Sequence, residues 1–212
     1  MKKYIFLTVP VVIAIFAACT KSAEFELEKS VYNADPYYPS LPAYSEWGYN
    51  TFGAYYDREL FTYNEKEVPA KVINTEGRTS FILKGGLDRI NYNDDYYSGY
   101  NTTYMDMSIA FELPGFLPET YVDLVQLNDT IYDLTNPDCH VFATIDTATF
   151  EMDIFSGQLE FTRAQQLLVD KKPTKVILSG YFDFKALVDK EPISISYGRF
   201  DVGVGEFNFF NY

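Results

Sequence analysis

Residues 178–184 read LSGYFDF, and FSGQLEF at 155–161 repeats the order of an apolar residue, Ser-Gly, a variable residue, an apolar residue, an acid and Phe. SYGRFDV at 196–202 is a looser third copy. Apolar and polar side chains alternate in each copy, which is the period of a β-strand with one buried face. The residues predicted to face inward are Leu159, Phe161, Phe182, Phe184, Phe200 and Val202. Three such strands in succession predict an antiparallel meander.

The apolar positions change phase around Gly198. Upstream they are odd-numbered and downstream they are even-numbered. The upstream set is Ile193, Ile195 and Tyr197, and the downstream set is Phe200, Val202 and Val204. One extra residue must be absorbed between the two sets, which predicts a β-bulge near Gly198.

Shorter strand-like runs precede the meander. Two of them flank Asp57-Arg58 within NTFGAYYDRELFTY (50–63), which predicts a hairpin. KVINTEGRTSFILKG (71–85) predicts another hairpin, because Gly77 is free to take a positive φ in its turn.

The remaining sequence adds strands rather than helices. Further strand-like runs of alternating apolar residues are MSIAFEL (107–113), CHVFATI (139–145) and FEMDIF (150–155). TRAQQLLVDKK (162–172) alone has helix-forming composition, and it is either a short helix or a loop between two meander strands. We therefore expect an all-β fold, an antiparallel sandwich or flattened barrel with a C-terminal meander and at most one short helix.

Composition supports this fold class and excludes one class of partner. Of the 212 residues 18% are aromatic, with 19 Tyr and 18 Phe, and such rings favour half-buried pleated surfaces. The net charge is −13, and no Lys/Arg cluster offers the basic face that phosphates require. We expect no nucleic-acid partner.

The N-terminus has the sequence features of a cleaved secretory signal peptide. Lys2 and Lys3 precede an uncharged apolar segment that is shorter than the roughly 20 residues of a membrane-spanning helix and that contains Pro10. Phe16-Ala17-Ala18-Cys19 resembles the lipobox of bacterial lipoproteins, which implies a lipid anchor on Cys19. The alternative is an ordinary cleaved signal followed by an incidental cysteine.

These features divide the chain into three parts. Residues 1–18 are the expected lipoprotein signal peptide, and residues 19–45 the expected lipid-anchored tether, which contains three prolines and no clear periodicity. Residues 46–212 are the expected single β domain.

The motifs NTFG (50–53), SGYFDF (179–184) and GRFDV (198–202) together resemble a group of small Bacteroidota-type outer-membrane lipoproteins of unknown function. The resemblance covers the ends of the mature domain well and residues 85–140 poorly. It implies an all-β lipoprotein domain and brings no catalytic residues. In that context Thr130 and Thr147, each preceded by Asp, resemble sites of bacterial O-glycosylation.

The sequence offers few combinations of residues that could form a catalytic or metal site. Lipidation of Cys19 leaves Cys139 as the sole thiol, and its neighbour His140 is the sole histidine. Adjacent residues of a strand point to opposite faces, so we do not expect a Cys–His pair. Neither a His pair nor a CxxC is present for zinc, and the acidic loop at 91–101 lacks EF-hand spacing. We expect no catalytic residues, metal or cofactor.

Five tyrosines crowd one polar segment and are the candidate ligand contacts, although they could instead cover the end of the β core. They are Tyr92, Tyr96, Tyr97, Tyr100 and Tyr104. The expected function is that of a lipid-anchored, non-catalytic binding or structural domain of a Gram-negative cell envelope, on the periplasmic or cell-surface face of the outer membrane. The alternatives are a carbohydrate-active or glycan-binding surface lipoprotein and a subunit of a surface assembly, so the expected partners are the membrane and either a glycan or a protein.

Overall fold

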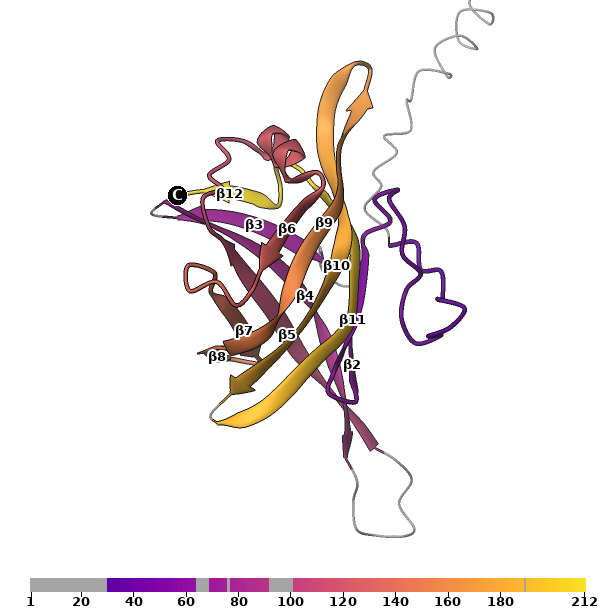
Figure 1. Ribbon diagram of the computed structural model, residues 1–212. Coiled ribbons are helices and arrows are strands. Elements are labelled where there is room, and N and C mark those ends of the chain that lie inside the picture. Colours follow the sequence, from indigo (N-terminus) through magenta and orange to yellow (C-terminus); the bar gives the residue numbers. More distant parts are fainter. Residues whose placement is uncertain (1–29, 64–68, 76, 92–100, 189) are drawn as a thin grey trace, which may run out of the picture.

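The computed structural model describes residues 30–63, 69–75, 77–91, 101–188 and 190–212. Within them a single sheet of twelve strands curls into a half-barrel (Figure 1). The predicted all-β fold class is therefore confirmed. The curl creates a concave side, which holds the core, and a convex outer side.

The strands are β1 (Thr51–Tyr56), β2 (Glu59–Thr62), β3 (Ala70–Thr75), β4 (Arg78–Asn91), β5 (Asn101–Leu113), β6 (Thr130–Asp133), β7 (Val141–Ile145), β8 (Ala148–Glu151), β9 (Asp153–Val169), β10 (Lys172–Val188), β11 (Glu191–Val204) and β12 (Phe209–Asn211). Their order in the sheet is β6-β9-β10-β11-β1-β2-β4-β5-β7-β8, with β3 beside β4 and β12 parallel to β3. The 3₁₀-helix η1 (Tyr121–Leu127) packs against β9 and β10 and buries Leu124 and Leu127.

The predicted C-terminal meander is confirmed. Strands β9, β10 and β11 are consecutive in the chain, adjacent in the sheet and antiparallel. All six residues predicted to face inward are buried in the core. The alternation of apolar and polar residues thus defined both the strands and their inner face.

The predicted bulge near Gly198 is also present, but its effect on Tyr197 was predicted wrongly. Between Phe182 and Phe184 of β10, the partner on β11 moves from Gly198 to Ile195, so β11 carries one extra residue. Tyr197 adopts a φ of 56° at this point. The bulge turns its side chain to the outer side, where half of it is exposed, instead of leaving it inside with Ile195.

Residues 162–172 form neither the predicted short helix nor a loop. Strand β9 continues through them to Val169, and the turn into β10 is only Asp170-Lys171. Both turn residues have positive φ, 50° and 64°, as tight two-residue hairpins require. Pairing with β10 outweighs a helix propensity that differs between ordinary residues by only about 0.7 kcal/mol.

Both predicted N-terminal hairpins are confirmed. Asp57-Arg58 connects β1 to β2, with Tyr56 paired to Glu59. Strands β3 and β4 pair up to their shared turn, in which Gly77 adopts a φ of 81°.

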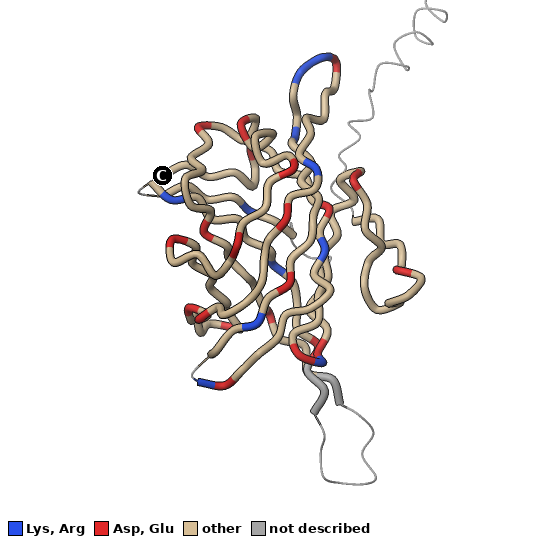
Figure 2. The backbone as a smooth tube through the Cα atoms, in the orientation of Figure 1, with Lys and Arg blue, Asp and Glu red and all other residues tan. Residues whose placement is uncertain are grey.

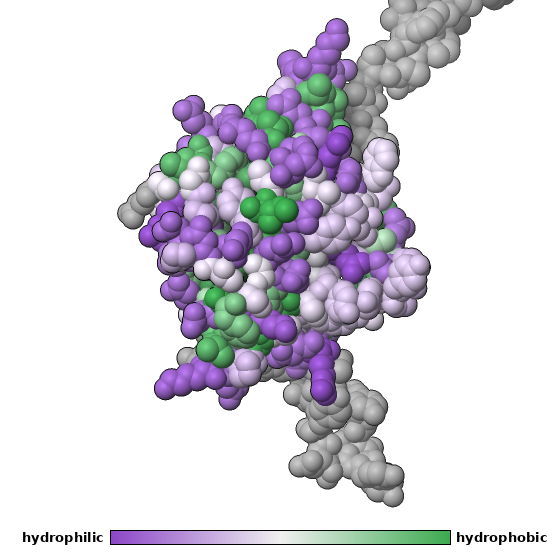
Figure 3. Space-filling view, viewed as in Figure 1, coloured by the Kyte–Doolittle hydropathy of each residue, from purple (hydrophilic) through white to green (hydrophobic). Residues whose placement is uncertain are grey.

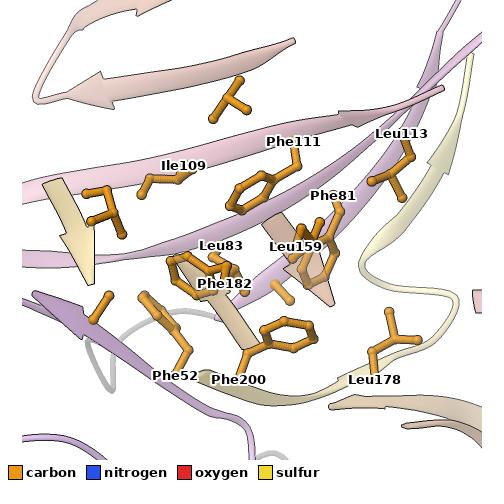
Figure 4. Packing of buried hydrophobic residues seen from close by; sticks show 14 of the residues in the cluster. Phe52, Phe81, Leu83, Ile109, Phe111, Leu113, Leu159, Leu178, Phe182 and Phe200 are labelled. Atoms are coloured by element: carbon orange, nitrogen blue, oxygen red, sulfur yellow. The ribbon is translucent and has the colours of Figure 1, made fainter. Parts of the chain in front are cut away.

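Phenylalanine rings fill the concave side of the sheet (Figure 4). The centroid of the Phe81 ring lies 5.2 Å from the centroids of both Phe161 and Phe200, and that of Phe111 lies 5.6 Å from that of Phe182. Rings from β4 and β5 therefore contact rings from β9, β10 and β11. One continuous cluster joins the two halves of the curled sheet.

Replacing the central ring tests this core. We expect Phe81→Ala to lower the free energy of unfolding by about 3–5 kcal/mol, because it leaves a cavity among rings that have little freedom to move. Urea denaturation measures the loss. Phe207→Ala is the control, since that ring is 87% exposed and its loss should change stability by no more than about 0.5 kcal/mol. Equal effects of the two substitutions would contradict this description of the core.

Candidate functional site

Residues 31–50, here called the strap, cross the outer side of β10, β11 and β1 (Figure 1). Inside the strap, Val31 N–H donates to the Tyr49 carbonyl at 2.9 Å, and Leu41 is fully buried. Gln165 of β9 donates to the Glu46 carbonyl at 3.0 Å. The part of the predicted tether that the structure describes, residues 30–45, therefore lies along the β domain.

Asp201 of β11 fixes the strap to the sheet. Its Oδ1 accepts hydrogen bonds from Gly48 N–H at 2.7 Å and from the Ser179 hydroxyl at 3.0 Å. Its Oδ2 accepts from the backbone N–H groups of Trp47 and Tyr49 at 3.2 and 3.1 Å, and from the Ser45 hydroxyl. The residue is only 2% exposed. Five donors thus compensate the cost of burying a carboxylate.

The strap comes close to β1 at Gly53. A Cβ atom at this position would lie 2.6 Å from Cδ of Pro42, which is closer than carbon atoms pack. Asn50, three residues earlier, accepts a hydrogen bond from Gly203 N–H of β11 at 2.9 Å. Gly53 therefore makes room for the strap, and Asn50 ties its end to the sheet.

An ion pair holds the middle of the strap. The Arg199 guanidinium lies 2.5 Å from a carboxylate oxygen of Asp35 and 5.7 Å above the centre of the Tyr38 ring. Both charged side chains are largely buried. The single cation of β11 on this surface is therefore neutralised by the strap itself.

The environment of Asp35 favours its ionised form. Burial alone would raise the pKa of this carboxyl, but the N–H groups of Tyr37 and Tyr38 and the charge of Arg199 together lower the pKa below its ordinary value. The two N–H groups donate to Asp35 Oδ1 at 2.8 and 2.9 Å. The strap thus carries a carboxylate that stays charged at neutral pH.

Aromatic side chains gather where the strap meets the sheet, and we call this surface the aromatic face. Its members are Tyr32, Tyr37, Tyr38, Tyr44, Trp47, Tyr181 and Tyr197. Tyr37 is 86% exposed and Trp47 is 70% exposed. On the strap side of the molecule, Figure 3 shows mostly pale atoms of intermediate hydropathy, unlike the darker purple of the charged surface elsewhere.

Stacking fixes several of these rings. Tyr44 stacks on Tyr181 with centroids 4.5 Å apart, and Tyr38 packs on Tyr197 at 4.4 Å. Burial raises the pKa of both Tyr44 and Tyr181 above its ordinary value, and the Tyr44 hydroxyl donates to Glu46 at 2.9 Å. The face is a set of pre-positioned rings with polar edges.

The tyrosines predicted as ligand contacts lie elsewhere. Tyr104 is on β5, half exposed, with its ring over Gly86 of β4. Tyr92, Tyr96, Tyr97 and Tyr100 lie outside the described residues, as does Cys19.

The two predicted glycosylation residues differ in their surroundings. Thr130 begins β6 half-buried, and its hydroxyl donates to the Leu127 carbonyl at 2.6 Å. Thr147 is exposed in the turn between β7 and β8. Modification of either residue remains a prediction.

A second feature is an open depression of about 490 Å³ between the 134–140 segment and the junction of β8 with β9. His140 Nδ1 lies 2.6 Å from Glu151 Oε1 at its rim, and Cys139 is buried in its wall. Burial raises the pKa of the Cys139 thiol to about 11, which keeps it protonated and poorly nucleophilic at neutral pH. The aromatic face is therefore the better candidate site.

The described residues contain no group of three or more His, Cys, Asp or Glu residues placed to hold a metal ion. Over the same part of the chain, no helix has the length and apolar character needed to span a bilayer.

Comparison of the chain with protein-family models, with curated proteins and with solved structures gave no match.

Sequence reasoning missed the aromatic face. Its strap residues other than Tyr32 lie in PYYPSLPAYSEWGY (36–49), most of which the prolines assign to the expected tether. The density of Tyr and Trp in that segment was the available signal. Tyr181 and Tyr197 had no such signal, because only the fold places them beside it.

Removing the charge of Asp201 should release the strap. Asp201→Asn replaces one acceptor oxygen with an NH₂ donor that faces other donors, and we expect a loss of about 2–3 kcal/mol in the free energy of unfolding. Limited proteolysis should then cleave within the strap faster than in the wild type. Asp183→Asn, at an exposed carboxylate on β10, is the control. Unchanged cleavage of the strap in Asp201→Asn would contradict the assigned role.

The Asp35 ion pair should make stability depend on pH. Because the pKa of Asp35 is lower in the folded than in the unfolded state, its stabilising effect is complete above the unfolded value of about 3.9. That effect is lost as the pH falls through the folded-state value. The difference in urea midpoint between wild type and Asp35→Asn should therefore be present at pH 7 and vanish in acid. A difference that is constant with pH would contradict this account.

Proposed function

We propose that this protein is a lipid-anchored domain of the outer membrane that acts by binding, not by catalysis, and that it binds a carbohydrate through the aromatic face. The observation that carries the proposal is the exposure of Tyr37 and Trp47 on a strap whose Tyr38 and Tyr44 rings are held by stacking on the sheet. Large exposed aromatic groups are uncommon on the surface of a protein without a partner, and they concentrate at binding sites.

The chemistry of the face suits a sugar. The C–H groups on one side of a sugar ring carry partial positive charge, and the face of an aromatic ring is electron-rich. The hydroxyls of Tyr44 and Tyr181 and the carboxylate of Glu46 offer hydrogen-bond partners around the rings, with Tyr44 already donating to Glu46 at 2.9 Å. The aromatic face thus offers both apolar contact and hydrogen bonding, and a sugar, with its C–H groups and hydroxyls, requires both.

Rigidity favours the same interpretation. Immobilising a flexible side chain on binding costs about 0.5–1.5 kcal/mol. The stacked pairs Tyr44–Tyr181 and Tyr38–Tyr197 have already lost that freedom in the folded protein. Binding at the face therefore requires little further ordering.

The anchor places this face near a lipid leaflet. Cys19 precedes Ser30 by 11 residues, a stretch whose greatest length is about 40 Å. Because the strap from Val31 onward belongs to the folded domain, only these residues can separate the domain from the lipid. The expected ligand is therefore a carbohydrate present at the membrane surface, on either side of the outer membrane.

A glycan array tests the binding proposal. We expect the purified domain, residues 20–212, to bind at least one class of glycan, and Trp47→Ala and Tyr37→Ala to reduce that binding at least ten-fold because each removes an exposed ring.

Phe207→Ala is the matched control, since it removes an equally exposed ring outside the aromatic face. Its binding should equal that of the wild type. An array without any binding, or an equal loss in all three variants, would count against the proposal.

The lipid anchor is tested separately. We expect mass spectrometry of the protein purified from its native host to find Cys19 as the first residue, carrying a diacylglyceryl thioether. Cys19→Ser should move the protein from the membrane to the soluble fraction, because without acyl chains its membrane affinity disappears. An unmodified Cys19 in a membrane-bound wild type would overturn the anchor.

A further inference from the structure

We infer that the ligand of the aromatic face is an uncharged polysaccharide segment and not an acidic one; this inference rests on the proposed function. Three features of the face support it: its charge, the spacing of its rings and its supply of hydrogen-bonding groups.

The charge of the strap is unsuited to an anionic ligand. Residues 31–50 contain Asp35 and Glu46 and no Lys or Arg, and Figure 2 shows acidic but no basic positions along the strap. Arg199 is only 10% exposed in its side chain and is paired with Asp35. A uronate or sulfate group would therefore meet the carboxylate of Glu46, the only charge on this part of the strap and a negative one, without a free cation on the strap to compensate.

The rings are spaced for more than one sugar unit. Tyr181 lies opposite Arg199 in the pairing of β10 with β11, and Tyr197 lies two residues before Arg199. Strand spacing and rise place these two positions on the order of 8 Å apart. With Tyr44 stacked on Tyr181 and Tyr38 on Tyr197, two ring pairs flank the Arg199–Asp35 ion pair. Such a row fits consecutive sugars of a chain better than one monosaccharide.

The polar groups of the face suit hydroxyls. Carboxylates accept from sugar hydroxyls without needing a countercharge, and the Glu46 side chain lies beside the Tyr44–Tyr181 pair. The Tyr181 hydroxyl, protonated because burial raises its pKa further above neutral, supplies a donor, while the Tyr44 proton is already donated to Glu46. Neutral polysaccharide offers both partners and adds no charge to be desolvated.

Affinity electrophoresis distinguishes the two ligand classes. Purified residues 20–212 are run in native gels that contain dextran, mannan, xylan or xyloglucan, and in gels that contain alginate or polygalacturonate. We expect retardation by at least one of the four neutral polymers and by neither acidic polymer. Trp47→Ala and Tyr37→Ala should weaken retardation at least ten-fold, while Phe207→Ala migrates as the wild type does.

A variant with reversed charge sharpens the test. Glu46→Lys should gain retardation by alginate or polygalacturonate, because it supplies the cation that the strap lacks. Thermal unfolding of each variant shows whether it remains folded, and only folded variants are compared.

The failures are distinguishable. Retardation of the wild type by an acidic polymer that is lost in Trp47→Ala overturns this inference and leaves the proposed function intact. No retardation in any gel, together with loss of cross-linking to envelope proteins in cells carrying Trp47→Ala, makes the face a protein interface and overturns both.

Discussion

The carboxylate of Asp201 is the contact on which the outer surface of this protein depends. An ionised group that is 2% exposed has lost most of its hydration, and such a loss is tolerable only when hydrogen bonds replace it. Three of its five donors are consecutive backbone N–H groups, from Trp47 to Tyr49, and a fourth is Ser45. The contact therefore stabilises both sides: it holds the strap on the sheet, and it gives the buried carboxylate its hydrogen-bond donors.

The sequence motifs noted at the outset converge on this contact. Asn50 and Gly53 belong to NTFG, and they tie down the strap and make room for it. Ser179, from SGYFDF, donates to Asp201, which itself belongs to GRFDV. The same strands turn their phenylalanines inward to the core, so each motif has an inner side that packs and an outer side that holds the strap. The aromatic face is a consequence of this second role.

Local sequence patterns predicted the inner side of the meander strands well, because the alternation of apolar and polar residues with period two indicates directly which side chains are buried. Phe182 and Phe200 were placed correctly on that basis. Two outcomes depended on contacts between distant segments and could not be predicted from local pattern. Residues 162–169 form strand because β10 lies beside them, and Tyr197 turns outward at a bulge whose position was predicted but whose geometry was not. The strap was missed for the same reason, since its partners on β11 are 152 or 153 residues away in the chain.

Hydrogen exchange of the strap amides tests the central contact most directly. The account predicts that the amides of Gly48 and Tyr49 exchange slowly, with protection close to that of β11, and that Asp201→Asn accelerates their exchange while β11 stays protected. Exchange of these amides at the rate of unstructured chain in the wild type would contradict it, because the strap would then not be held and the aromatic face would not exist as a fixed surface.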